Sequence, residues 1–148
     1  MNEIQFNIQQ EFRDKQEKYV YYLIALSVSA IGFSVYKTEK LSLTFSQIPL
    51  AIAVLSWGLS IFCGLKFLKY TISNLYANND YFEIIKGKHP DIGNQPELIK
   101  VGVESFREAM KTNGKTMKKY FRFQSYLFYS GIILFIVWHT IEMYLKTY

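Results

Sequence analysis

Residues 48–65, with the sequence IPLAIAVLSWGLSIFCGL, form an apolar run that indicates the fold class of this chain. As a helix, this apolar run is long enough to cross a hydrocarbon core of about 30 Å at about 1.5 Å per residue. Similar apolar runs occupy residues 20–36 (VYYLIALSVSAIGFSVY) and residues 125–141 (SYLFYSGIILFIVWHTI). Because backbone polar groups in lipid must be satisfied within their own segment, each run is predicted to be a helix.

The distribution of the apolar residues indicates the class of protein. Half of the 148 residues are hydrophobic and 18% are aromatic, which a soluble domain of this length could also bury. The apolar residues, however, fall into three blocks separated by charge-rich segments, so a soluble helical bundle is the less favoured alternative. The sequence predicts one all-α integral membrane domain over residues 1–148, with transmembrane spans near residues 19–36, 47–66 and 122–145.

The positions of the basic residues predict the orientation of the spans. Of seventeen Lys and Arg residues, three precede the first span, two lie in the following loop, eleven lie in residues 66–122 and one is Lys146. Placing the N-terminus and the middle segment inside gives fourteen basic residues on that side and three outside, which is the positive-inside asymmetry. We therefore expect a multi-pass protein of the plasma (inner) membrane with a cytoplasmic N-terminus, an external Lys40 and an external C-terminus.

The middle segment, residues 67–120, is predicted to be a cytosolic antiparallel helical hairpin that extends the second and third spans. Its two arms repeat seam residues at intervals of three and four, which is typical of a coiled coil. The seam includes Leu75, Asn79 and Phe82 in the first arm and Val103, Phe106 and Met110 in the second. Gly87 and Pro90 are expected to end the first arm, and Pro96 to start the second.

Two local features of the helical segments remain open in the sequence. Asn113 and Gly114 form a turn dipeptide, which favours either a hinge in the second arm or a continuous helix weakened by glycine. At the N-terminus, Ile4, Ile8 and Phe12 are four residues apart and predict a short amphipathic helix that precedes the first span. This helix is expected to pack on the hairpin, and the alternative is that it lies on the membrane surface.

Small residues recur at helical spacing in the first two spans. They are Ala25, Ser29 and Gly32 in the first span and Ala53, Ser56, Ser60 and Gly64 in the second. Small side chains let helix backbones approach closely in lipid. The stripes are expected to join the first two spans. The alternatives are that one stripe is an oligomer interface, or that small residues are simply common in transmembrane spans. The third span has no such stripe, so we expect it to lie at the periphery with its aromatic side toward lipid.

Two groups of ionisable residues could carry a function. His139 and Glu142 share a helix face in the third span, where they would either line an ion path or lie in the interfacial aromatic belt, the favoured interpretation. A basic cluster borders the same span on its cytosolic side. This cluster comprises Lys111, Lys115, Lys118, Lys119 and Arg122, and either sets the topology or binds anionic lipid.

The sequence contains no phosphate loop, nucleophile pair or metal-ligand spacing, and its single cysteine, Cys63, cannot form an intrachain disulfide. No enzyme activity, cofactor or nucleic-acid partner is expected. In architecture, though in no motif, the chain is similar to membrane effector proteins of bacterial anti-phage systems. We therefore expect a homo-oligomeric effector or channel-like subunit controlled through its hairpin. The alternative is a membrane anchor whose hairpin binds a soluble cytosolic protein.

Overall fold

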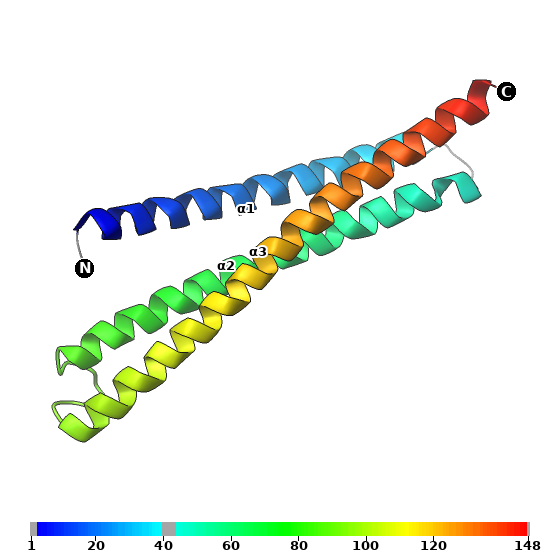
Figure 1. The fold of residues 1–148 in the computed structure, drawn as a ribbon. Coiled ribbons are helices and arrows are strands. Elements are labelled where there is room, and N and C mark those ends of the chain that lie inside the picture. The colour runs from blue at the N-terminus through cyan, green and yellow to red at the C-terminus, as the bar shows by residue number, and fades with distance from the viewer. Residues whose placement is uncertain (1–2, 40–43, 148) are drawn as a thin grey trace. The chain divides into compact units, whose positions relative to one another are not determined.

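A computed structural model describes residues 3–39 and 44–147, with side chains from residue 7 onward, and over these residues it contains helices joined by turns and no strand. It contains α1 (Glu3–Thr38), the 3-10 helix η1 (Phe45–Gln47), α2 (Ile48–Ile85) and α3 (Pro96–Thr147) (Figure 1). Each α-helix includes a stretch long and apolar enough to cross a membrane. The predicted all-helical fold with three candidate spans is therefore confirmed. Lys40 lies outside the described residues.

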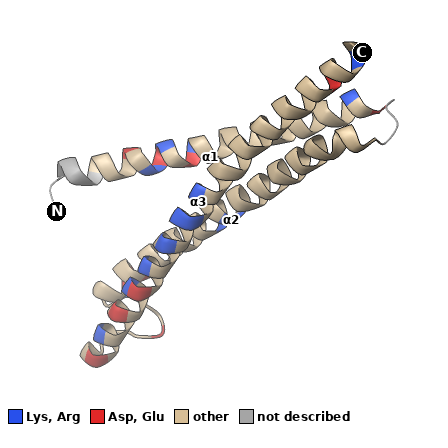
Figure 2. Cartoon of the chain, turned by 45° about the vertical axis from the view of Figure 1, so that its right-hand side comes forward, with Lys and Arg blue, Asp and Glu red and all other residues tan. Residues whose placement is uncertain are grey.

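Charged side chains are unevenly distributed along the three helices (Figure 2). They gather on the N-terminal part of α1, the C-terminal part of α2 and the N-terminal half of α3. Residues 19–36, 48–65 and 123–141 carry no Lys, Arg, Asp or Glu. Because a charged side chain at the centre of a bilayer costs about 2.5–3.5 kcal/mol or more, these three stretches are the parts of the helices suited to lipid.

The chain divides into two compact units. The three-helix unit comprises Met1–Leu65 and Phe121–Tyr148, and the two-helix unit comprises Lys66–Tyr120. Buried positions in the three-helix unit follow one another at intervals of three and four on each helix, the spacing of knobs-into-holes packing. They include Val20, Leu23 and Ser27 on α1, Ala53, Trp57, Ser60 and Gly64 on α2, and Gln124, Phe128, Gly131 and Trp138 on α3.

The two-helix unit pairs the C-terminal part of α2 with the N-terminal part of α3. Tyr70 stacks on Tyr120 with ring centroids 5.9 Å apart, and Ile84 packs beside Gly102. Because the partner number falls as the residue number rises, the two segments are antiparallel. The predicted pairing of the two arms is therefore present, whereas its cytosolic location remains a prediction.

The turn between α2 and α3 follows from its glycine and proline residues. Gly87 has a positive φ of 66°, a conformation that glycine adopts without steric cost. The N–H of Lys88 donates to the carbonyl of Glu83 (2.9 Å) and that of Gly87 donates to Ile84 (3.0 Å), which is a Schellman cap. Helix α3 then begins at Pro96, as predicted, because the first helical position needs no N–H donor.

Helix α3 continues without a break through Asn113 and Gly114. A glycine inside a helix costs about 1 kcal/mol, whereas a helix end leaves four unpaired carbonyls and a new start leaves four unpaired N–H groups. Of the two alternatives left open by the sequence, the continuous helix is therefore the one adopted. Asn113 Nδ2 also reaches across to Ser73 Oγ at 3.4 Å, which adds a contact between the arms.

The N-terminal segment is part of α1 rather than a separate short helix. Ile8 and Phe12 are 60% and 62% exposed. One turn of this segment is supported by Lys15, whose Nζ lies 2.8 Å from Glu11 Oε1. The hydrogen bond and the opposite charge lower the pKa of Glu11 and raise the pKa of Lys15, although such an exposed pair stabilises a helix only slightly.

Candidate functional site

The small residues of α2 form the close-packed centre of the three-helix unit. Ala53, Ser56, Ser60 and Gly64 are all buried. A Cβ atom added at Gly64 would lie 2.5 Å from Gln124 Nε2 on α3 and 2.9 Å from the side chain of Ile24 on α1. The small residues of α2 therefore allow α1 and α3 of the same chain to pack closely against it.

Two hydrogen bonds, which involve Ser60, Gln124 and Val20, link the three helices at this centre. Ser60 Oγ donates a hydrogen bond to the carbonyl oxygen of Gln124 (2.9 Å), and Gln124 Nε2 donates to the carbonyl oxygen of Val20 (3.2 Å). All three residues are buried. Hydrogen bonds between helices in a membrane contribute about 0.6–2 kcal/mol each and fix their register. The sequence analysis did not single out Gln124, although an amide at the edge of an apolar block is a usable signal.

A second close approach joins α2 and α3 one to two turns farther along. The indole of Trp57 donates a hydrogen bond to the carbonyl oxygen of Phe128 (3.3 Å) and lies against Gly131, which has no side chain to exclude it. Trp57 and Phe128 are buried and form a hydrophobic core with Leu23 and Ala53. The glycine on α3 is therefore required by the large ring on α2.

These contacts correct the expectation that the third span turns its aromatic side to lipid. Phe128 and Trp138 are 7% and 5% exposed, and Phe135 is half-buried against Trp57, with ring centroids 5.9 Å apart. The exposed aromatic residues of this span are Phe123, Tyr126, Tyr129 and Tyr144. The error arose because a stripe of small residues was required on both partners, whereas small residues on α2 are sufficient to receive large ones from α3.

The small residues of the first span lie on the opposite side of α1 from the core. Ala25, Ser29 and Gly32 are exposed, and no atom would lie within 4 Å of a Cβ added at Gly32. Ser29 Oγ bonds within its own helix, to the carbonyl oxygen of Ala25 (2.9 Å). Among the residues that the structure describes, this stripe therefore joins no other helix, and contact between copies remains a prediction.

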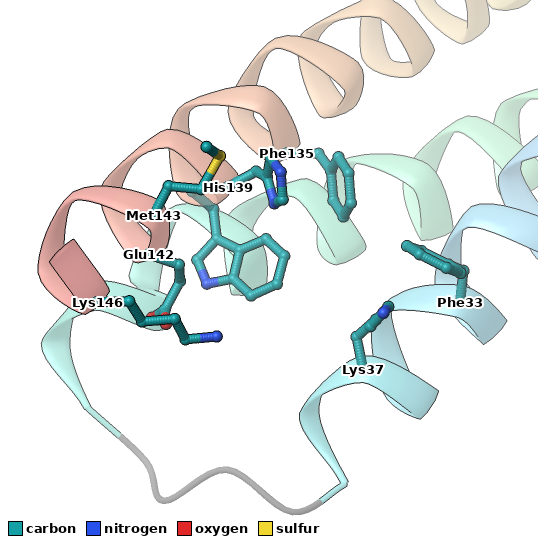
Figure 3. A pocket seen from close by; sticks show the side chains of 8 residues that line it. Phe33, Lys37, Phe135, His139, Glu142, Met143 and Lys146 are labelled. Atoms are coloured by element: carbon teal, nitrogen blue, oxygen red, sulfur yellow. The ribbon is translucent and has the colours of Figure 1, made fainter.

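His139 and Glu142 line one pocket at the C-terminal ends of α1 and α3, which we name the terminal pocket (Figure 3). Glu142 Oε1 accepts a 2.7 Å hydrogen bond from Ser46 Oγ of η1, and His139 is exposed. The pocket has a volume of about 460 Å³. Its lining consists of Phe33, Lys37, Phe135, Trp138, His139, Glu142, Met143 and Lys146.

The predicted seam residues of the two-helix unit differ in burial between the two arms. Val103, Phe106 and Met110 of the second arm are half-buried. On the first arm Leu75, Asn79 and Phe82 are exposed, and the buried positions are Phe67, Thr71 and Ile84. The observed seam is thus rotated by about one residue, or about 100°, from the more apolar face that the spacing had indicated.

The rotation leaves an apolar surface on the first arm. We name this surface the outer arm face; it consists of Ile72, Leu75, Tyr76 and Phe82, each between 51% and 70% exposed. Residues three and four apart share one side of a helix, so the four side chains form a continuous stripe. The polar residue of this stripe is Asn79, whose Nδ2 donates to Glu83 Oε1 (3.4 Å) on the same helix.

The predicted basic cluster is exposed on α3. All five residues are exposed: Lys111, Lys115, Lys118, Lys119 and Arg122. Among residues 3–39 and 44–147, no group of three or more His, Cys, Asp or Glu side chains is arranged to hold a metal ion.

No protein-family model, curated protein or solved structure matches the chain, so its function is inferred from its own residues.

Proposed function

We propose that the chain is a subunit of a homo-oligomeric membrane effector or channel-like assembly, and that a cytosolic two-helix unit controls its spans. The observation that carries this proposal is the uncovered small-residue stripe of α1, Ala25, Ser29 and Gly32. In lipid there is little hydrophobic drive between helices, and close backbone packing takes its place. A stripe that meets no helix among the described residues of its own chain is suited to meet the same stripe of another copy.

The proposed action follows from this association. One set of three helices has a core filled by Leu23, Trp57 and Phe128 and offers no path for ions through its centre. Several copies that pack through α1 would instead form a pathway between subunits. A signal received by the two-helix unit would change the packing of the spans and open this pathway. The effector acts in the plasma (inner) membrane of a bacterium, with the N-terminus inside and the C-terminus outside.

Permeability measurements with two matched glycine variants test this proposal. Gly32 on α1 and Gly58 on α2 are both exposed, and neither has an atom within 4 Å of its added Cβ, so a leucine at either position would extend from the surface of the single chain. We expect wild-type protein to release dye from liposomes and to depolarise cells on overexpression. Gly32→Leu should lower both the mass measured by light scattering in detergent and the dye release, whereas Gly58→Leu should match wild type.

Two results would contradict the proposal. One is a wild-type protein that stays monomeric in detergent and neither leaks dye nor depolarises cells. The other is an equal effect of Gly32→Leu and Gly58→Leu, because it would mean that any bulky residue on the lipid-facing surface perturbs the protein.

A second function, a membrane anchor for a soluble partner, is favoured by the outer arm face of the two-helix unit. Its exposed apolar side chains are of the kind that bind an apolar groove or helix in another protein. Under this alternative, wild-type protein would be monomeric and would not release dye from liposomes. A soluble protein would copurify with it and would be lost in the Leu75→Glu variant, in which the substituted side chain is already exposed.

A further inference from the structure

We infer that the terminal pocket between α1 and α3 binds one anionic phospholipid, with its phosphate at the two lysines and an acyl chain against the aromatic side chains. Figure 3 shows the pocket with residues from both helices converging on one space. A volume of about 460 Å³ holds part of a lipid, namely the head group and the first segment of a chain.

On both helices that line the pocket, the aromatic residues precede the lysines in the sequence. Phe33 and Phe135 come from the lipid-suited stretches of α1 and α3, whereas Lys37 and Lys146 follow those stretches toward the helix C-termini. Lys37 lies one turn beyond Phe33, and Lys146 about 16 Å beyond Phe135 by helical rise. This order matches a lipid whose chain points toward the membrane interior and whose phosphate lies at the interface.

The two lysines have charge available for an anion. Lys37 Nζ lies 5.6 Å from the ring centroid of Phe33, and neither lysine forms an ion pair among the residues that the structure describes. The one carboxylate in the pocket, Glu142, accepts a hydrogen bond from Ser46. Two ammonium groups and one carboxylate leave a net positive pocket, which favours an anionic over a zwitterionic head group.

A buried donor in the pocket lacks a partner. Trp138 lines the pocket, is 5% exposed, and its Nε1 has no hydrogen-bond acceptor among the residues that the structure describes. Buried donors are almost always paired, so an unpaired indole N–H beside a pocket indicates a missing acceptor. A phosphate or ester oxygen of the lipid supplies it. One ligand would thus contact the aromatic side chains, the two lysines and the unpaired indole N–H of the pocket.

Titration of the purified full-length protein in a non-ionic detergent tests this inference, with binding followed by native mass spectrometry. The probes are phosphatidylglycerol, phosphatidylcholine, a free fatty acid and inorganic phosphate. We expect saturable binding of one phosphatidylglycerol per chain, and clearly weaker binding of the other three. Each interfacial lysine contributes about fivefold, so the double variant Lys37→Gln/Lys146→Gln should weaken binding by about 25-fold.

Two further variants separate the pocket from general charge and folding effects. The double variant Lys86→Gln/Lys88→Gln removes the same charge from the exposed turn after α2 and should bind phosphatidylglycerol like wild type. Trp138→Phe retains an aromatic ring but removes the N–H, and should weaken binding by about fivefold to tenfold at unchanged helical content.

The inference is overturned if phosphatidylcholine binds as tightly as phosphatidylglycerol, or if both lysine double variants bind alike. A free fatty acid that binds as tightly as phosphatidylglycerol would also overturn it, because the head-group phosphate would then contribute nothing. Tight binding of inorganic phosphate alone would contradict the role of the aromatic side chains.

Discussion

The Gly131→Ala substitution is a sharp test of how α2 and α3 pack. A Cβ atom at position 131 would lie 2.5 Å from Nε1, 2.8 Å from Cδ1 and 2.9 Å from Cε2 of Trp57. The indole would have to retreat until these contacts reach at least 3.4 Å, the start of ordinary van der Waals separation. Trp57 is 3% exposed and donates to the carbonyl oxygen of Phe128, so it cannot move without breaking that hydrogen bond.

The expected change in the free energy of unfolding is the sum of one stabilising and two destabilising contributions. Alanine gains about 1 kcal/mol over glycine as a helix former. Overpacking of a filled core costs about 1–3 kcal/mol. Loss of the Trp57–Phe128 hydrogen bond costs about 1 kcal/mol more. We therefore expect Gly131→Ala to lower the free energy of unfolding by about 2 kcal/mol.

Unfolding in mixed micelles with increasing SDS, followed by tryptophan fluorescence, measures this change. Gly58→Ala is the matched control, because a Cβ added at Gly58 meets no atom within 4 Å. The control should be neutral, or up to about 1 kcal/mol more stable than wild type. If Gly131→Ala proves as stable as Gly58→Ala, the close approach of Trp57 to α3 is wrong.

Two further predictions concern topology and the two-helix unit. Cysteines that replace Lys88 and Lys40, in a Cys63→Ser background, report the orientation of the spans when intact cells are treated with an impermeant thiol reagent. The cysteine at position 40 should be labelled and the cysteine at position 88 protected. The reverse pattern would refute the orientation inferred from the fourteen-to-three distribution of basic residues. In the second arm, Phe106→Asp places a carboxylate at a half-buried position and should lower the free energy of unfolding by about 1–3 kcal/mol. Lys100→Asp, at an exposed position, should change the free energy of unfolding by less than about 0.5 kcal/mol. Equal melting temperatures of the two variants would show that Phe106 does not pack between the arms.

Local chemistry explains why the helices and their ends could be predicted from the sequence. The three apolar runs set the helical spans, because no other backbone conformation satisfies its hydrogen bonds in lipid without a partner. Gly87 and Pro96 set the turn, because each has a conformational property that acts within a few residues. None of these features depends on the position of a distant helix.

The side of each helix that packs was harder to predict, because it depends on the partner. On α1 the small residues suggested one face, but Leu23 and Ser27 form the buried face instead. On the first arm of the two-helix unit, the more apolar side remains uncovered while Thr71 is buried. Gln124 was missed because its acceptor, the carbonyl of Val20, lies 104 residues away. An amide is inexpensive in a membrane core only where such an acceptor is available.

We propose that copies of this chain associate through the outer side of α1, and disulfide cross-linking in native membranes can detect this association. Ser29→Cys places a thiol on the exposed stripe of α1, and Leu55→Cys places one on an exposed position of α2, both within the apolar stretches and in a Cys63→Ser background. Under mild oxidation, Ser29→Cys should give a covalent dimer that Gly32→Leu abolishes, while Leu55→Cys stays monomeric. Equal cross-linking at both positions, or a monomer at position 29, would contradict the claim.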